Sequence, residues 1–224
     1  MCDEGSHEVR KYVHISPRWL GIELGHRMKL RSIHMNAAAS VPVLLVPGLG
    51  GSGSGHWQTR WHATIPGMQW LAQRDWDAPS RDDWLEALSS ALVASDRPML
   101  LIAHSLGCAL VAHWAARSGT GVAGALLVAP ADVDSSAHTP SAVRSFAPMP
   151  MVPLPFPAVV VARRDDPYVG FDRAHQLASA WRCRLIDADP AGHINADSGL
   201  GDWPTGQAIL ARMGARAAAT SFSC

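Results

Sequence analysis

The stretch MLLIAHSLG, residues 99–107, is an apolar run that ends on a serine and continues into an alanine-rich segment. The run has the composition of a strand buried on both faces, and the segment after it is typical of a helix. A serine at a sharp strand-to-helix turn is a nucleophile elbow, which lifts its hydroxyl above the carboxyl edge of a sheet and beside the N–H groups of a helix N-terminus. Gly107 supplies the small residue needed after Ser105, whereas Ala103 stands where a glycine is usual before it. A plain helix N-cap serine is the alternative interpretation.

Strand and helix patterns alternate through the rest of the chain from Val41 onward. This alternation predicts the α/β class, with a mostly parallel sheet and helices on both of its faces. Residues 131–157 are rich in proline and lack periodicity, so we expect a loop region with at most one short helix and no large lid. The predicted strands are Val41–Pro47, Trp70–Gln73, Met99–His104, Val122–Ala129, Ala158–Arg163 and Cys183–Ala188, and the predicted helices are Trp57–Thr64, Arg81–Ser95, Leu106–Arg117, Asp172–Trp181 and Thr205–Arg216.

A nucleophilic serine needs a base, and the base needs an acid that orients it. After such an elbow the chain order is serine, then Asp or Glu, then His, with each residue on a loop that follows a strand. Asp166 follows the fifth predicted strand and His193 follows the sixth, so both order and spacing fit. Ser105, Asp166 and His193 are therefore the predicted catalytic triad. Asp165, next to Asp166, and Asp132, after the preceding strand, are the alternatives for the acid.

The glycine-rich loop PGLGGSGSGHW, residues 47–57, follows the first predicted strand, where an oxyanion hole takes its second N–H group. Glycine lets the backbone approach a substrate carbonyl closely, so we assign the N–H groups of Leu49 and Leu106 to the oxyanion hole. The loop also matches G-x-G-x-x-G, but no helix opens at the third glycine and no Gly-Lys-Ser/Thr follows, which argues against a dinucleotide or phosphate site. For His56 and Trp57, a packed tryptophan beside a partly exposed histidine is favoured over a role in lining the site.

Composition limits the class of protein further. The chain has 224 residues, of which 48% are hydrophobic and 17% charged, and its net charge is +0, which suits one globular domain and gives no basic excess for nucleic acid. The apolar runs are shorter than the roughly 18–20 residues that span a bilayer. The four cysteines have no zinc or redox spacing, and no His-Glu-x-x-His occurs. We therefore expect free thiols, a cytoplasmic location, no metal, no cofactor and no membrane or nucleic-acid partner.

The first forty residues differ in character from the rest of the chain. They are polar, and Asp3 and Glu4 are followed by no apolar segment of a secretory signal. We expect residues 1–40 to be a poorly ordered N-terminal extension, residues 41–217 to be the α/β domain, and residues 218–224 to be a tail. Met35 lies just before the domain pattern, so two hypotheses stand for residues 1–34: an upstream choice of start codon, or a helix packed on the domain.

The motifs taken together resemble a known family, the small single-domain serine hydrolases that include the retinoblastoma-binding serine hydrolase and short bacterial esterases. The resemblance spans about Val41 to Met213. It implies a compact α/β-hydrolase fold without the first antiparallel strand pair, the triad named above, and carboxylesterase-like activity. The motifs that carry it are Pro47-Gly48-Leu49-Gly50-Gly51, His56-Trp57-Gln58, His104-Ser105-Leu106-Gly107-Cys108, Asp165-Asp166-Pro167-Tyr168-Val169, Gly192-His193-Ile194-Asn195 and Gly199-Leu200-Gly201-Asp202-Trp203-Pro204.

We expect a serine hydrolase that cleaves small esters through an acyl-enzyme on Ser105. A non-catalytic protein-binding module on the same fold is the alternative, because a fold alone does not prove activity, and a cofactor-free perhydrolase is a third hypothesis. The sequence does not separate esters from thioesters, amides or lactones, and it leaves the oligomeric state open. In the proline-rich segment, an acyl-facing wall and ordinary loop packing are both hypotheses for Met149, Met151, Leu154 and Phe156.

Overall fold

The computed structural model describes residues 41–188 and 192–221, so the predicted N-terminal extension and the last residues of the predicted tail lie outside it. The last helix continues to Ser221, four residues past the predicted end of the domain at residue 217. The strands are β1 (Val43–Val46), β2 (Met68–Trp70), β3 (Met99–His104), β4 (Val122–Val128), β5 (Ala158–Ala162) and β6 (Arg184–Asp187). The helices are α1 (Trp57–Thr64), α2 (Arg81–Val93), α3 (Leu106–Arg117), α4 (Phe171–Ala180) and α5 (Pro204–Ser221), with short 3₁₀ turns η2 (Ser141–Phe146) and η3 (Ala196–Ser198).

The strands form one six-stranded sheet in the order β2-β1-β3-β4-β5-β6, and every neighbouring pair is parallel. The predicted α/β class with a mostly parallel sheet is therefore confirmed. Because β2 and β3 lie on opposite sides of β1, the direction of winding reverses between β1 and β3. In open α/β sheets, ligands bind outside the carboxyl ends of the strands at such a switch point.

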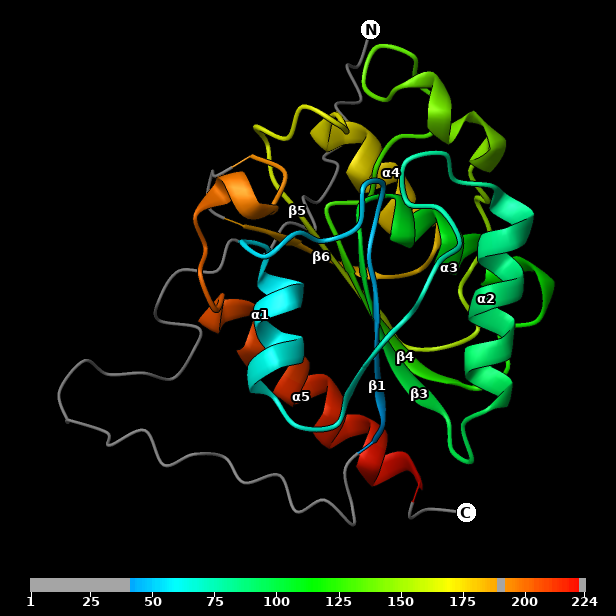
Figure 1. The fold of residues 1–224 in the computed structure, drawn as a ribbon, viewed down its shortest axis with the longest axis vertical. Helices are drawn as coiled ribbons and strands as arrows, with labels where there is room; N and C mark the ends of the chain where they lie inside the picture. Colours follow the sequence, from blue (N-terminus) through cyan, green and yellow to red (C-terminus); the bar gives the residue numbers. More distant parts are fainter. Residues whose placement is uncertain (1–40, 189–191, 222–224) are drawn as a thin grey trace, which may run out of the picture.

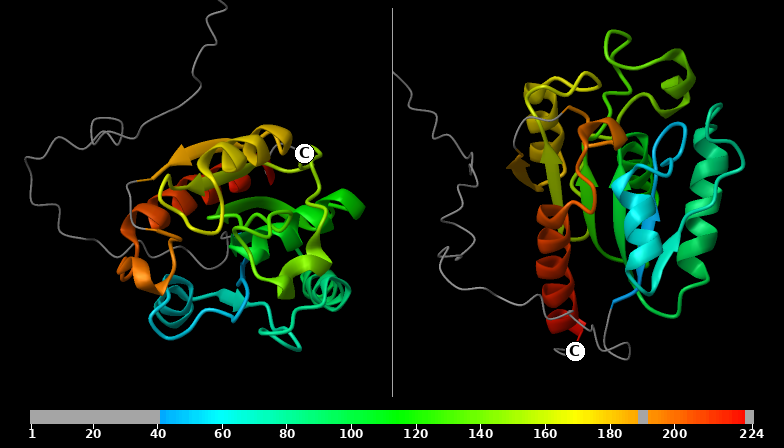
Figure 2. Two further views of the ribbon diagram at one scale, coloured as in Figure 1. Left: turned by 90° about the horizontal axis from the view of Figure 1, so that it is seen from above. Right: turned by 60° about the vertical axis from the view of Figure 1, so that its left-hand side comes forward.

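Helices cover both faces of the sheet, as Figure 1 and Figure 2 show. Alternate residues of β1 illustrate the two cores: Leu44 and Val46 pack toward α2, α3 and α4, whereas Val43 and Leu45 pack toward α1 and α5. Strands that are buried on both sides have continuous apolar sequences, and β3, which is buried at every position, is apolar from Met99 to Ala103. Burial of apolar surface on both faces holds these layers together, at about 25 cal/mol for each Å² removed from water.

The edge strand β2 is the element whose predicted position differs most. The sequence pattern indicates Trp70–Gln73, but the strand is Met68–Trp70 and pairs Met68 with Val43 of β1. Its residues are half-buried or exposed, so no continuous apolar run marks it. The pairing with β1 on one side alone sets its register.

Candidate active site

The turn at Ser105 joins β3 to α3 and holds the serine at φ 55° and ψ −120°. A non-glycine residue in such a conformation costs on the order of 1–3 kcal/mol and persists where its surroundings fix it. Gly107 is required here, because a Cβ at that position would overlap the carbonyl oxygen of Val46. The methyl group of Ala103 is fully buried within β3, so the departure from glycine at this position is compatible with the turn.

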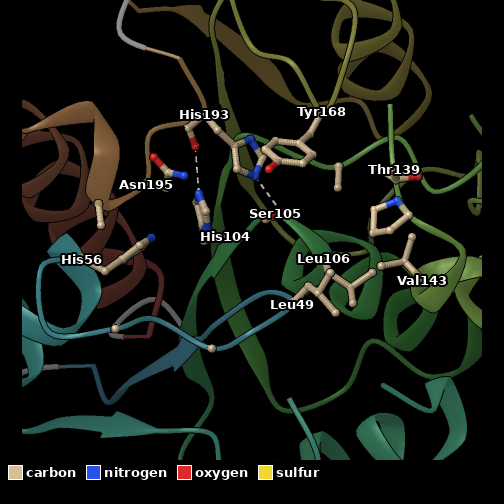
Figure 3. Close-up of a pocket in the computed structure, with 15 residues that line it drawn as sticks. Leu49, His56, His104, Ser105, Leu106, Thr139, Val143, Tyr168, His193 and Asn195 are labelled. Atoms are coloured by element: carbon tan, nitrogen blue, oxygen red, sulfur yellow. Dashed lines mark hydrogen bonds between the residues drawn. The ribbon is translucent and has the colours of Figure 1, made fainter. Parts of the chain in front are cut away.

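Ser105, His193 and Asp166 form a row of hydrogen bonds at the carboxyl edge of the sheet. Figure 3 shows the first of these bonds, between Ser105 and His193. The Ser105 Oγ lies 2.8 Å from His193 Nε2, and His193 Nδ1 lies 2.9 Å from each carboxylate oxygen of Asp166. Because a carboxylate accepts only, Nδ1 carries the proton and donates it, which leaves Nε2 to accept from the serine hydroxyl. The Tyr168 N–H donates to Asp166 Oδ1 at 2.8 Å and fixes the carboxylate further.

The two alternatives for the acid contact other groups. Asp165 Oδ2 accepts a hydrogen bond of 2.9 Å from the N–H of Gly192, and Asp132 Oδ1 lies 3.3 Å from the guanidinium of Arg173. The geometry thus supports Asp166 as the acid. Asp165 instead anchors the backbone of the loop that carries the histidine.

Two further hydrogen bonds hold the backbone around His193. The His104 Nε2 group lies 2.9 Å from the His193 carbonyl oxygen, and the Trp57 indole N–H donates to the Ile194 carbonyl at 2.7 Å. Burial above all, with the nearby His193, holds the pKa of His104 well below its usual value, so this ring is neutral and donates from Nε2. These contacts join β3 and α1 to the histidine loop and fix the direction of its imidazole.

The backbone N–H groups of Leu49 and Leu106 lie beside the elbow. Leu106 is the first residue of α3, where a helix leaves its N–H groups without an internal partner. The glycine loop approaches closely, because a Cβ at Gly48 would lie 2.8 Å from Ser105 Cβ and 3.1 Å from Leu106 N. Within the described residues, neither the Leu49 nor the Leu106 N–H donates to another backbone group outside helices and strands. Their assignment to an oxyanion hole stays a prediction, which this geometry supports.

A cavity of about 290 Å³ opens above Ser105. Figure 3 shows His56 and Asn195 on one side of the serine and Thr139 and Val143 on the other. His56 is only 4% exposed, so the favoured interpretation of a partly exposed histidine is wrong, although the expected packing of its neighbouring tryptophan is right. Residues that line the cavity and that the motifs do not single out are Ala131, Thr139, Pro140, Val143 and Ala196.

The proline-rich segment contributes to the cavity through residues other than its four large apolar side chains. Thr139, Pro140 and Val143 line it, and they precede or belong to η2. Of the four apolar residues considered for an acyl-facing wall, none lines the cavity, so ordinary loop packing is the correct alternative. Met149 and Phe156 are buried in the core, Leu154 packs against it, and Met151 is 42% exposed.

The two cysteines that the structure describes are poor candidates for a nucleophile. Cys108 and Cys183 are free thiols, and burial raises the pKa of both, which keeps them protonated and unreactive. Residues 41–188 and 192–221 contain no group of three or more His, Cys, Asp and Glu side chains placed to hold a metal ion. Over the same residues, no helix has both the length and the apolar character needed to cross a membrane.

Solved structures of similar fold indicate the class of protein. The ydeN gene product of Bacillus subtilis shares 21% sequence identity with this chain at a TM-score of 0.62, over 78% of this chain and 98% of that one. A monoacylglycerol lipase of Paleococcus ferrophilus shares 15% identity at a TM-score of 0.58, over 79% of this chain and 96% of that one. At these identities the likeness concerns the fold alone, and the fold is that of the α/β-hydrolases.

The family is shown by closer matches. A protein of Pectobacterium atrosepticum described as a YdeN-like hydrolase shares 34% identity at a TM-score of 0.73, over 80% of this chain and 94% of that one. The model of the serine hydrolase family matches residues 43–212. The chain therefore belongs to the serine hydrolase family and is a hydrolase, as its motifs predict. Comparison with curated protein sequences gives no significant match.

Proposed function

We propose that this hydrolase cleaves carboxylic esters, with Ser105 as nucleophile, His193 as general base and Asp166 as the acid that orients the base. The observation that carries the proposal is the row of hydrogen bonds from Ser105 Oγ through the imidazole to the Asp166 carboxylate, at 2.8 Å and 2.9 Å, on the wall of an open cavity. A serine is a weak nucleophile by itself and is activated by a base held in this way.

The chemistry runs in two halves. His193 Nε2 takes the hydroxyl proton of Ser105 as Oγ attacks the ester carbonyl, and then gives that proton to the departing alcohol. Water attacks the acyl-enzyme in the second half, again with His193 as base. Asp166 keeps the Nδ1–H tautomer and stabilises the imidazolium in both halves.

The developing oxyanion needs donors that are already in place. The N–H groups of Leu49 and Leu106 are the proposed donors, because both residues line the cavity beside Ser105. The loss of one such donor typically raises the barrier by roughly 3–4 kcal/mol.

The cavity favours small, neutral substrates. Its volume of about 290 Å³ is at the low end for ligand pockets, and segment 131–157 is too short for a large lid. The side chains that line it include no Asp, Glu, Lys or Arg among the residues the structure describes. A charged substrate would lose hydration there without gaining an opposite charge.

The direct test is covalent labelling with a fluorophosphonate probe, followed by peptide mapping. We expect one label, on Ser105, in the wild-type protein and none in Ser105→Ala. Hydrolysis of p-nitrophenyl acetate should fall by roughly 10⁴-fold or more in Ser105→Ala and in His193→Gln, because triad residues act as a unit. Circular dichroism should show that both variants remain folded.

Three outcomes would contradict the proposal in different ways. Folded wild-type protein that neither reacts with the probe nor cleaves esters would favour the protein-binding module. Retention of most activity by Ser105→Ala would remove the serine as nucleophile. Faster turnover of a matched amide or thioester than of the ester would keep the triad and change the substrate class.

A further inference from the structure

His56 is a polar side chain of the cavity that the proposed reaction does not use. It caps the N-terminus of α1, where its Nδ1 accepts a hydrogen bond of 3.1 Å from the N–H of Gln58. This bond fixes the orientation of the ring. Because Nδ1 accepts, the proton of the neutral ring is on Nε2, so that atom is a donor with a defined position.

The surroundings keep the His56 ring neutral. Burial, followed by the charge of His193, lowers the pKa of His56 to about 4. The ring lies 4.7 Å from the ring of His104 and 5.2 Å from that of Trp57, measured between centroids. At neutral pH it therefore offers one N–H donor and carries no charge.

The Nε2 atom of His56 is buried and has no hydrogen-bond partner among the described residues. Buried donors are nearly always paired in native proteins, because an unmade hydrogen bond is destabilising. His56 lines the cavity that holds Ser105, and in Figure 3 a nitrogen of its ring points toward His104, which lines the same cavity. A donor left unpaired at the wall of a cavity is placed to meet an acceptor that enters it.

The glycine loop has open space next to His56, whose backbone N–H donates to the Gly53 carbonyl oxygen at 2.9 Å. Gly53 also lines the cavity, is exposed, and has no atom within 4 Å of the position that a Cβ would take. Asn195 lies on the same side of Ser105 (Figure 3). Its Oδ1 accepts the N–H of Asp197 at 3.1 Å, which leaves its amide NH₂ to donate. One end of the cavity therefore presents donors.

We propose that His56 is a specificity-determining residue whose Nε2–H donates to a neutral oxygen of the substrate, an ether, hydroxyl or carbonyl oxygen outside the scissile ester group. This inference rests on the proposed esterase function and names a substrate class for the same site. A site built to donate to an oxygen discriminates against the analogue that lacks it, because the buried donor is then left unpaired. Short esters with such an oxygen are the favoured substrates.

Isosteric pairs of esters isolate this interaction. On the acyl side, p-nitrophenyl methoxyacetate replaces one methylene of p-nitrophenyl butanoate by oxygen, and on the alcohol side 2-methoxyethyl acetate does the same for butyl acetate. The quantity measured is the ratio of kcat/KM for the oxygen ester to that for the alkyl ester. Comparing this ratio between wild type and variant cancels the intrinsic reactivity of each ester.

Two substitutions separate the donor of His56 from its role as helix cap. His56→Asn keeps an acceptor near the position of Nδ1 for the Gln58 N–H, and asparagine is a good N-cap, but it removes the donor at Nε2. His56→Gln places an amide NH₂ near the position of Nε2 and gives up the cap. The fraction of competent sites in each protein is counted by fluorophosphonate titration of Ser105.

We expect His56→Asn to lower the oxygen-to-alkyl ratio about tenfold in one of the two series, and His56→Gln to keep it within about threefold of wild type. The series that responds tells whether the oxygen belongs to the acyl or the alcohol part. An unchanged ratio in His56→Asn in both series, or an equal loss in both variants, overturns the inference. Wild-type protein that the probe does not label overturns the proposed function and this inference with it.

Discussion

The two ends of the cavity, on either side of Ser105 in Figure 3, are built in different ways. We call His56, His104 and Asn195 the histidine end, and Thr139, Pro140 and Val143 the segment end. The histidine end is tied to regular structure: His104 is the last residue of β3, and His56 caps α1. The segment end belongs to residues 131–157, which contain no strand and one 3₁₀ turn.

At the segment end, hydrogen bonds from one side chain hold the backbone in place of those of a helix or strand. The Arg144 guanidinium donates to the carbonyl oxygens of Val133 at 2.7 Å, Ser135 at 3.0 Å and Thr139 at 2.7 Å. A guanidinium offers five donors in a rigid plane, so it can bind these three carbonyl oxygens at once. Ser105 is thus positioned by the sheet, whereas the opposite wall is held by the local hydrogen bonds of Arg144.

The largest effect on kcat is expected at the edge of the sheet, where the adjacent carboxylates of Asp165 and Asp166 follow β5. Asp166→Asn should lower kcat by about 10⁴-fold, because an amide no longer holds His193 in the required tautomer. Asp165→Asn keeps an oxygen to accept the Gly192 N–H and should lower kcat less than about tenfold. Initial rates with p-nitrophenyl acetate measure both, with circular dichroism to check folding. An equal loss in the two variants would show that the loop anchor matters as much as the proposed acid.

The strand ends also explain how far the sequence can predict the site. In a parallel sheet the carboxyl ends of all strands meet at one edge, so Ser105, Asp166 and His193 can be expected to meet once each is placed after a strand. The choice among the three aspartates is less secure, because the sequence of a turn does not tell which of two neighbours points at the histidine. The contacts of Asp165 and Asp132 with other groups support Asp166.

What the sequence cannot predict depends on contacts between distant residues. The burial of His56 comes from its packing against His104 and its place beside the glycine loop, and neither leaves a periodic pattern. Val143 lies on the cavity wall next to Arg144, whose hydrogen bonds reach residues up to 11 positions away in the chain. The edge strand β2 is displaced for a similar reason, since pairing with β1 sets its register.

A second prediction tests whether the segment end is independent of the triad. Arg144→Lys removes the planar fork that binds the carbonyl oxygens of the buried residues Val133 and Thr139, which should lower the free energy of unfolding by about 1–3 kcal/mol. We expect KM for p-nitrophenyl butanoate to rise several-fold, with a smaller change in kcat, because the wall loosens while the hydrogen bonds of Ser105 stay. Thermal denaturation and steady-state kinetics measure the two effects. Arg74→Lys, at a side chain that is 81% exposed, is the matched control.

If kcat fell more than KM rose in Arg144→Lys, the two ends of the cavity would be coupled. The sheet and the Arg144 side chain would then not hold the two ends of the cavity independently of each other. Unchanged KM with lower stability would instead show that Thr139 and Val143 contribute little to binding.

The smallest predicted effect is on the free energy of unfolding in acid. It arises at the histidine end of the cavity, where His56 can take up a proton. The lowered pKa of about 4 for His56 lies below the roughly 6.5 expected when the chain is unfolded. Between these values the unfolded chain binds more protons than the folded one, so stability is lost as the pH falls from about 6.5 to 4, by up to about 1 kcal/mol for each pH unit.

The variant His56→Asn removes this contribution, whereas buried His104 keeps its own. The melting temperature of His56→Asn should therefore fall less steeply than that of wild type between pH 7 and pH 5, and His62→Asn, at an exposed position of the same helix, is the control. Equal slopes in wild type and His56→Asn would mean that His56 accepts a proton in the folded protein as readily as in the unfolded chain, and the neutral donor at the histidine end would be lost with that result.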